Sequence, residues 1–209
     1  MEGNELLRVN HLKKYFQTPH GTLSAVDDVT FGINERETLG VVGESGCGKS
    51  TLGRCILRLH EPTAGEVVFE GKNILACDKK EMKSLRSKMQ IIFQDPYASL
   101  NPRMTVSQAI AAPLIIQGVY SAKEKEKIQK KVAEMMDVVG LASRLVNSYP
   151  HELDGGRRQR IGIARALSLD PKFIVCDEPV SALDVSIQAQ VLNLMQDLQQ
   201  QMGLTYLFI

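Results

Sequence analysis

The sequence lacks an excess of charge of either sign. Its 25 lysines and arginines are balanced by 24 aspartates and glutamates, which leaves a net charge of +1. A chain with this balance has no overall electrostatic attraction to nucleic acid or to acidic lipid. We therefore expect no nucleic-acid partner.

Cysteines are few, and their spacing suits neither disulfides nor a metal site. The four are Cys47, Cys55, Cys77 and Cys176. No two of them form a C-x-x-C pair, and none lies at metal-ligand spacing to a histidine. This pattern indicates reduced thiols in a cytosolic protein.

Long hydrophobic runs are also missing. The most apolar window, AIAAPLIIQGV, is interrupted by Pro113 and Gln117 and is too short to cross a bilayer. The first residues, MEGNELLRV, are not the basic and then apolar start of a signal peptide. We therefore expect any association with a membrane to come through a partner.

Strand patterns dominate the first third of the chain, and helical patterns follow. The strand-like segments are ELLRVNHL, SAVDDVTFGI, TLGVVG and the hairpin GEVVFEGKNI, whose turn is expected near Gly71 and Lys72. Helices are predicted over residues 79–88 and over most of 105–140, and the strand MQIIF lies between them.

The last third alternates again between strand and helix. KFIVCDE is an apolar strand that ends in two acids, and SIQAQVLNLMQDLQQQM is an amphipathic helix. Its expected buried face consists of Ile187, Val191, Leu194, Leu198 and Met202. This alternation predicts an α/β fold with a mostly parallel sheet and a helical insert around residues 95–160. The sequence stops inside the apolar strand LTYLFI, so we expect a truncated chain.

The most specific motif is GESGCGKST, which fits the phosphate-binding pattern G-x-x-x-x-G-K-[ST]. It follows a strand and precedes a helical run, as the motif requires. Its backbone N–H groups would surround a phosphate, Lys49 would neutralise β- and γ-phosphate oxygens, and Ser50 would hold Mg²⁺. The alternative is a glycine-rich turn with a chance lysine. The expected nucleotide contacts in the motif are Gly43, Glu44, Ser45, Gly46, Cys47, Gly48, Lys49, Ser50 and Thr51.

Two acids follow the buried strand FIVC. Asp177 would emerge at the carboxyl end of a parallel strand, where ligands collect, and would help to hold Mg²⁺. Glu178 is placed to take a proton from an attacking water. The alternative is a solvated turn at the strand end, which the motif upstream disfavours.

The motifs occur in one order: the phosphate loop, IIFQD, LDGGRRQR, FIVCDEP and SALD. In this the sequence resembles the ATP-binding subunits of ABC transporters, from HLKKYF to its end. QDPYASLNPRMTV and PVSALDVSIQAQVLNLM resemble the oligopeptide, dipeptide and nickel importer branch. The resemblance implies a P-loop NTPase core with a mostly parallel sheet, an N-terminal antiparallel β subdomain and a helical insert. Residues 1–94 and 161–209 would form the core, and 95–160 the helical subdomain of a single domain.

The resemblance also implies roles for single residues. Tyr15 corresponds to the aromatic residue that stacks on adenine; Phe16 is the neighbouring candidate, and core packing is the alternative for either. Gln94 corresponds to the glutamine that contacts Mg²⁺ and the γ-phosphate region and links to the helical insert, with a simple polar strand end as the alternative. Asp184 matches a residue in a loop that crosses to a partner subunit, with a helix N-cap as the alternative. His151 is given a structural role.

The segment LDGGR occupies the place of the family signature, usually L-S-G-G-Q. In that family two subunits dimerise head to tail, and the signature of one faces the ATP held by the other. Gly155 and Gly156 would let N–H groups and the positive end of their helix approach the γ-phosphate. The alternative is an ordinary capped surface helix.

Asp154 departs from the family serine. Aspartate is an equally good N-cap, so the fold should tolerate it. A carboxylate about 4 Å from a phosphate charge costs about 4 kcal/mol at an effective dielectric of about 20, which would weaken dimer closure on the order of a thousandfold. Arg157 would lie on the same side of the helix and offset part of this.

The resemblance implies an ATPase that powers uptake of oligopeptides, dipeptides or a similar solute. Its cofactors would be ATP and Mg²⁺. Its partners would be a second ATP-binding subunit, identical or paralogous, two transmembrane permease subunits and, indirectly, a solute-binding protein. It would lie on the cytoplasmic face of the cell membrane, held there by the permeases.

Two other functions stay open: a soluble ABC-type ATPase without a transporter, and a non-catalytic regulatory cassette. The family's switch histidine would follow LTYLFI, where this sequence ends. We therefore expect this polypeptide to bind nucleotide and to hydrolyse it slowly.

Overall fold

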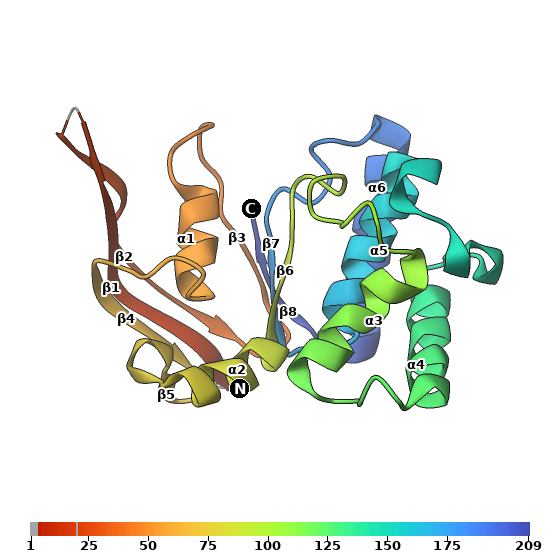
Figure 1. Cartoon of the computed structure of the whole chain (residues 1–209). Coiled ribbons are helices and arrows are strands. Elements are labelled where there is room, and N and C mark those ends of the chain that lie inside the picture. Colours follow the sequence, from red (N-terminus) through yellow and green to blue (C-terminus); the bar gives the residue numbers. More distant parts are fainter. Residues whose placement is uncertain (1–3, 20) are drawn as a thin grey trace.

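The computed structural model describes residues 4–19 and 21–209, and it places an antiparallel sheet, a parallel sheet and a group of helices side by side (Figure 1). The first helix lies between the two sheets, and most of the other helices cover the far face of the parallel sheet. This arrangement confirms the expected α/β class with an N-terminal antiparallel part, a parallel sheet and helices.

The antiparallel sheet is formed by the N-terminal strands in the order β2-β1-β4-β5. Leu7 of β1 lies opposite Ile33 of β2 and Phe69 of β4, and all three side chains are buried. The predicted hairpin is present as β4 and β5, with the turn at positions 70 and 71. The four strands are β1 (Glu5–Thr18), β2 (Gly21–Asn34), β4 (Ala64–Phe69) and β5 (Lys72–Asn73).

The second sheet is parallel, with the order β3-β8-β7-β6. Strand β7 is internal to this sheet, and all of its residues are buried because neighbours cover both of its faces. The residues that follow β7 therefore emerge in the middle of the sheet's carboxyl edge. The four strands are β3 (Thr38–Gly40), β6 (Met89–Ile92), β7 (Phe173–Cys176) and β8 (Thr205–Phe208).

Six α-helices occur in the described part of the chain. The predicted helix over 79–88 is confirmed at both ends. Its start is stabilised by a capping box between Asp78 and Glu81. The helices are α1 (Lys49–Ile56), α2 (Lys79–Lys88), α3 (Val106–Gln117), α4 (Lys125–Val138), α5 (Gly155–Leu167) and α6 (Val185–Met202). Short 3₁₀ turns lie at Ile74–Ala76, Ser143–Asn147 and Pro150–Glu152. No helix among residues 4–19 and 21–209 has both the length and the apolarity that a membrane span needs.

Two hydrophobic cores meet at β7. Phe173 and Val175 pack in the core between the sheets, around α1, whereas Ile174 and Cys176 pack in the core beneath the helices. Successive side chains of a strand point to opposite faces, so one four-residue strand serves both cores. Packing on both faces of β7 therefore fixes the position of Asp177 and Glu178, which follow this strand.

The helical region agrees with the expected patterns, apart from one buried residue that the prediction omitted. Helix α6 buries Val191, Met195 and Leu198, and Met195 was missing from the predicted face. Ile187, Leu194 and Met202 are partly buried against the same core. The proposed subdomain boundary at residue 160 falls inside α5, which runs on to Leu167.

Candidate functional site

The glycine-rich loop between β3 and α1 has a backbone that only glycine can follow closely. Gly46 and Gly48 have φ of 79° and 99°, in the left-handed region. A Cβ at Gly48 would lie 1.9 Å from the carbonyl oxygen of Ala25 on β2, so no side chain fits there. The loop is thereby seated against the antiparallel sheet.

Lys49 begins α1 and folds back over this loop. Its Nζ donates hydrogen bonds to the carbonyl oxygens of Gly43, at 2.8 Å, and Glu44, at 2.7 Å. The N–H groups of the first turn of a helix have no partner within the helix, and the helix dipole makes this end positive. A cationic side chain and free N–H groups therefore meet at one place, which suits a phosphate group.

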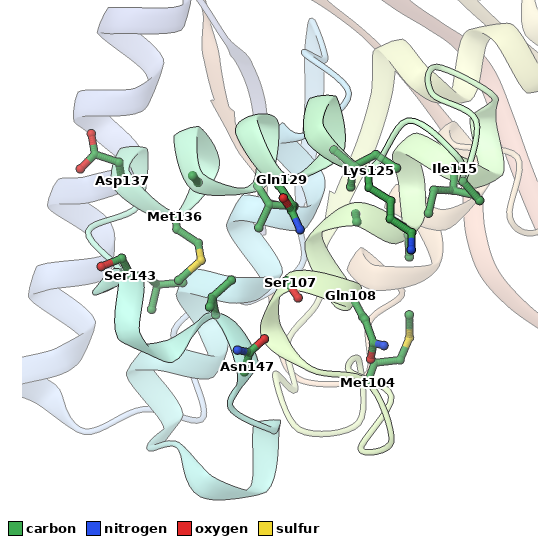
Figure 2. Close-up of a pocket in the computed structure, with 18 of the residues that line it drawn as sticks. Met104, Ser107, Gln108, Ile115, Lys125, Gln129, Met136, Asp137, Ser143 and Asn147 are labelled. Atoms are coloured by element: carbon green, nitrogen blue, oxygen red, sulfur yellow. The ribbon is translucent and has the colours of Figure 1, made fainter.

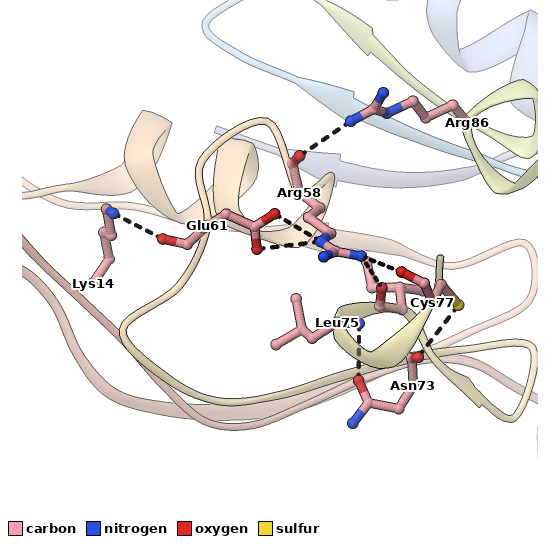
Figure 3. A network of polar contacts seen from close by, with 8 residues as sticks. Lys14, Arg58, Glu61, Asn73, Leu75, Cys77 and Arg86 are labelled. Carbon is pink, nitrogen blue, oxygen red and sulfur yellow. Dashed lines mark hydrogen bonds and ion pairs between the residues drawn. The ribbon is translucent and has the colours of Figure 1, made fainter. Parts of the chain in front are cut away.

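The far end of α1 is anchored by a polar network (Figure 3). The Arg58 guanidinium contacts the Glu61 carboxylate at 2.9 Å and donates to the carbonyl oxygen of Cys77 at 2.8 Å. Lys14 of β1 donates to the carbonyl oxygen of Glu61 at 2.7 Å. These contacts tie α1 to the antiparallel sheet, and they hold the helix that carries Lys49 in place.

Ser50 and Asp177 come together although they lie far apart in the sequence. The Ser50 hydroxyl donates to Asp177 Oδ1 at 2.6 Å, and the Asp177 side chain is only 2% exposed. Arg54, which the sequence analysis did not single out, lies 3.6 Å from the other carboxylate oxygen. Hydroxyl and carboxylate oxygens are suitable ligands for Mg²⁺, and Mg²⁺ beside phosphates needs only one or two protein ligands. The described residues contain no cluster of three or more His, Cys, Asp or Glu side chains suited to a metal.

Gln94 and Glu178 are paired by the register of the parallel sheet. Ile92 of β6 lies opposite Cys176 of β7, so the residues two positions further along are also neighbours. Gln94 Nε2 donates to Glu178 Oε2 at 2.6 Å. Glu178 has a φ of 45°, a backbone conformation that is uncommon outside glycine and often occurs at functional sites.

Tyr15 and Phe16 have different surroundings on β1. Tyr15 is half-buried, and its hydroxyl donates to Asp27, which raises the pKa of Tyr15. Its strand partner, Ser24, precedes the residue whose carbonyl oxygen lies against Gly48. Phe16 instead packs edge-on against His60, with ring centroids 6.0 Å apart. The register therefore favours Tyr15 as the aromatic residue beside the loop.

Asp154 is the N-cap of α5, as predicted. Its carboxylate accepts a hydrogen bond from the backbone N–H of Arg157 at 2.8 Å and pairs with the Arg157 guanidinium at 3.1 Å. The expected partial neutralisation by Arg157 is thus present. Both side chains are at least half exposed, so the pair itself adds little stability.

The two glycines after Asp154 have a packing role that sequence analysis missed. A Cβ at Gly156 would lie 2.6 Å from Cγ2 of Ile187 on α6, and one at Gly155 would lie 3.0 Å from Cδ2 of Leu183. A side chain at Gly156 would therefore push Ile187 away from α5, whereas one at Gly155 would need only a small shift of the Leu183 side chain. Asp184 occupies the N-cap position of α6, although its side chain makes no capping hydrogen bond.

A separate cavity of about 1410 Å³ lies in the helical region (Figure 2). Helices α3 and α4 and the turn at Ser143–Asn147 line it, with both apolar and polar side chains. Ile115 and Ile116 at the end of α3 line it and are 41% and 70% exposed. The sequence analysis did not predict this cavity, because its walls come from three segments that no local pattern brings together.

Comparison with known proteins agrees with this geometry. Oligopeptide transport ATP-binding protein OppF of Bacillus subtilis is 59% identical over 206 residues, which are 98% of this chain and 67% of the relative. Putative oligopeptide transport ATP-binding protein YkfD of the same organism is 55% identical over 205 residues, which are 98% of this chain and 62% of that relative. The chain thus spans about two thirds of the length of these curated relatives.

A solved structure has the same fold. The ATP-binding cassette MJ0796, in a dimeric post-hydrolysis state bound to ADP and Pi, superposes with a TM-score of 0.86 at 29% identity. The match covers 97% of this chain and 87% of that one. The family model described as ABC transporter matches residues 26–181, from β2 through the phosphate loop to the acids after β7. By its motifs, its fold and these relatives, the chain belongs to the ABC transporter family.

Proposed function

We propose that the chain is the ATP-binding and hydrolysing cassette of an importer for oligopeptides, dipeptides or a similar solute. The carrying observation is the meeting of two pairs beside the phosphate loop: Ser50 with Asp177, and Gln94 with Glu178. The names of the peptide-transport relatives support the class of solute.

The residues divide the chemistry among them. The loop of residues 43–51 binds the phosphates of ATP, and Lys49 neutralises their charge. Ser50, Asp177 and Gln94 would hold Mg²⁺, which would offset the negative charge of the phosphates. Glu178 accepts a proton from the attacking water, and Gln94 orients the Glu178 carboxylate through the hydrogen bond seen between them. Tyr15 stacks on adenine.

A second cassette completes the site. We propose that Gly155 and Gly156 at the start of α5 face the γ-phosphate held by the other subunit in a head-to-tail dimer. The dimeric state of the MJ0796 cassette supports this assembly. Bare backbone then serves two purposes, because it also permits the contact of α5 with Ile187 in the same chain.

In the dimer, the cavity between α3 and α4 of each cassette would receive one of the two permease subunits, which would hold the cassettes at the cytoplasmic face of the membrane. The exposed apolar side chain of Ile116 supports this choice of surface. The full-length protein should be co-purified with its permeases after Ile116→Asp. We expect the affinity for the permeases to fall by about thirtyfold, as for loss of a central apolar contact of about 2 kcal/mol, and recovery of the complex to fall with it.

The matched control for this experiment is Leu192→Asp, which places the same charge on an exposed apolar position of α6, outside the cavity. It should leave the complex intact. Undiminished recovery of permeases with Ile116→Asp would contradict docking at this cavity.

Asp154 is expected to weaken ATP-driven dimerisation. In a Glu178→Gln background, which slows hydrolysis, Asp154→Ser should strengthen dimerisation by about tenfold or more, but by less than the thousandfold of an unpaired carboxylate, because Arg157 already offsets part of the charge. Analytical ultracentrifugation with ATP measures this.

Asp154→Asn separates charge from hydrogen bonding, since asparagine caps a helix as well as aspartate does. If charge is the cause, the asparagine variant should also dimerise more strongly than the unchanged chain. Equal dimerisation of the unchanged, serine and asparagine chains would show that Asp154 does not weaken dimerisation.

Asp154 is also the observation that favours a second candidate function, that of a regulatory cassette with a weakened site.

A further inference from the structure

Asp177 is the one charged side chain that is fully buried in the described part of the chain. Its side chain is 2% exposed, whereas every other aspartate, glutamate, lysine and arginine among residues 4–19 and 21–209 is at least partly exposed. Burial removes the water that would stabilise a carboxylate, so a charge at this depth is unfavourable unless other groups satisfy it. The groups that contact Asp177 must therefore supply most of its stabilisation.

Helix α1 provides a partner for each oxygen of this carboxylate. The Ser50 hydroxyl donates to Asp177 Oδ1 at 2.6 Å, and Arg54 Nη2 lies 3.6 Å from Oδ2. Residues four apart lie on the same face of an α-helix, so α1 presents the hydroxyl and the guanidinium together toward the end of β7. Of the described lysines, arginines and histidines, only Arg54 comes within 4.0 Å of the Asp177 carboxylate.

Gly53 allows α1 to come close enough to β7 for these contacts. A Cβ at Gly53 would lie 2.7 Å from Cγ1 of Val175 on β7 and 3.3 Å from Cδ1 of Ile209. Val175 is fully buried, so its side chain has no free space to move into. A side chain at position 53 would therefore push α1 away from β7 and would separate Arg54 from Asp177.

Arg54 and Mg²⁺ differ in how long they can accompany the carboxylate. The guanidinium belongs to the chain and carries a permanent charge. Mg²⁺, by the proposed function, arrives and leaves with the nucleotide. Loss of one partner from a buried ion pair is strongly unfavourable, because the other charge stays buried without compensation. A carboxylate with Mg²⁺ as its only cation would meet this cost at every release of nucleotide.

We propose that Arg54 is a positioning residue that acts through Asp177, as the fixed counter-charge of this carboxylate while nucleotide and Mg²⁺ exchange. Ser50 and Arg54 hold the two carboxylate oxygens from one helix, so Oδ1 stays directed at the Ser50 hydroxyl throughout the cycle. This inference rests on the proposed function, because it requires nucleotide and Mg²⁺ to bind at the phosphate loop.

Binding of a fluorescent, non-hydrolysable ATP analogue to the full-length protein tests the proposal, once with Mg²⁺ and once with EDTA. Arg54→Met removes the charge but keeps an unbranched side chain with good helix propensity. In EDTA this variant should bind the analogue about tenfold more weakly, because the phosphates then approach an uncompensated carboxylate. With Mg²⁺, which supplies positive charge itself, the affinity should stay within about twofold of that of the unchanged protein.

Thermal unfolding gives a second measurement that does not depend on turnover. Without nucleotide and in EDTA, Arg54→Met should lower the unfolding midpoint by about 5–10 °C, as for a buried charge that has lost its partner. With the analogue and Mg²⁺ the decrease should be less than half as large. A loss of packing alone would lower the midpoint equally under both conditions.

Two further variants separate charge from other effects. Arg54→Lys should behave as the unchanged protein does, since the contact is a single ion pair and needs no planar fork. Lys83→Met removes a positive charge from an exposed position of α2 and should change neither measurement. If Arg54→Met does not fold, Arg54→Gln takes its place, with effects in the same direction.

The results distinguish failure of this inference from failure of the proposed function. Equal effects of Arg54→Met with Mg²⁺ and with EDTA, no effect under either condition, or a lysine variant as impaired as the methionine variant would each overturn the inference alone. If the unchanged protein did not bind the analogue under either condition, the proposed function would fail and the inference with it.

Discussion

Lys49→Ala is expected to weaken ATP binding by about a hundredfold or more. The Lys49 ammonium lies across the phosphate loop, within 2.8 Å of the carbonyl oxygens of Gly43 and Glu44. Lys49 is also the first residue of α1, whose first-turn N–H groups have no partner within the helix. Two charge-assisted hydrogen bonds to phosphate oxygens, each about 1.5 kcal/mol or more, are lost with the side chain. Titration with fluorescently labelled ATP measures the change.

The control for this variant is Lys130→Ala, at an exposed position of α4. It removes the same charge from the protein and should leave the affinity for ATP unchanged. If Lys49→Ala bound labelled ATP as tightly as the control, the phosphate loop would not be the nucleotide site, and the proposed function would fail at its first step.

Glu178→Gln is expected to slow hydrolysis by about a hundred- to ten-thousandfold, the usual contribution of a positioned general base. Glutamine has nearly the same shape, so the contact with Gln94 can persist, but it cannot accept the proton of the attacking water. ATP binding should be retained, since Glu178 is not among the groups expected to grip the phosphates.

Single-turnover hydrolysis in the full-length protein with its permeases measures this effect, and binding of labelled ATP is followed in parallel. Glu126→Gln, on the exposed face of α4, is the matched control and should hydrolyse at the unchanged rate. Hydrolysis by Glu178→Gln at the control rate would show that another group takes the proton. A regulatory cassette would instead show slow turnover before any substitution.

Features that depend on neighbouring residues were predicted well. The phosphate loop lies between β3 and α1, as its motif requires, and α2 covers the predicted residues 79–88. The N-cap of α5 at Asp154 and its pairing with Arg157 were also foreseen. Each of these depends on groups within one turn of a helix or one loop, where local spacing determines which atoms can meet.

The helical region was predicted less completely. Sequence periodicity indicated the buried face of α6 but omitted Met195, and it offered no sign of the cavity between α3 and α4. Arg54 was missed for a similar reason, because only the approach of α1 to the end of β7 brings it near Asp177. A contact between separate elements has no signature in either element alone.

What the sequence determined by itself was the kinds of groups and their local geometry: the glycine-rich loop, the acids after a buried strand and the capped start of α5. The tertiary structure decided which groups meet. The register of β6 and β7 places Gln94 against Glu178, and the packing of α1 on the sheet brings Ser50 to Asp177, 127 residues away. The packing of α6 also supplies a second reason for Gly156. The physical reason is that hydrogen bonding and sterics act locally along the chain, whereas strand register and core packing are set by the whole fold.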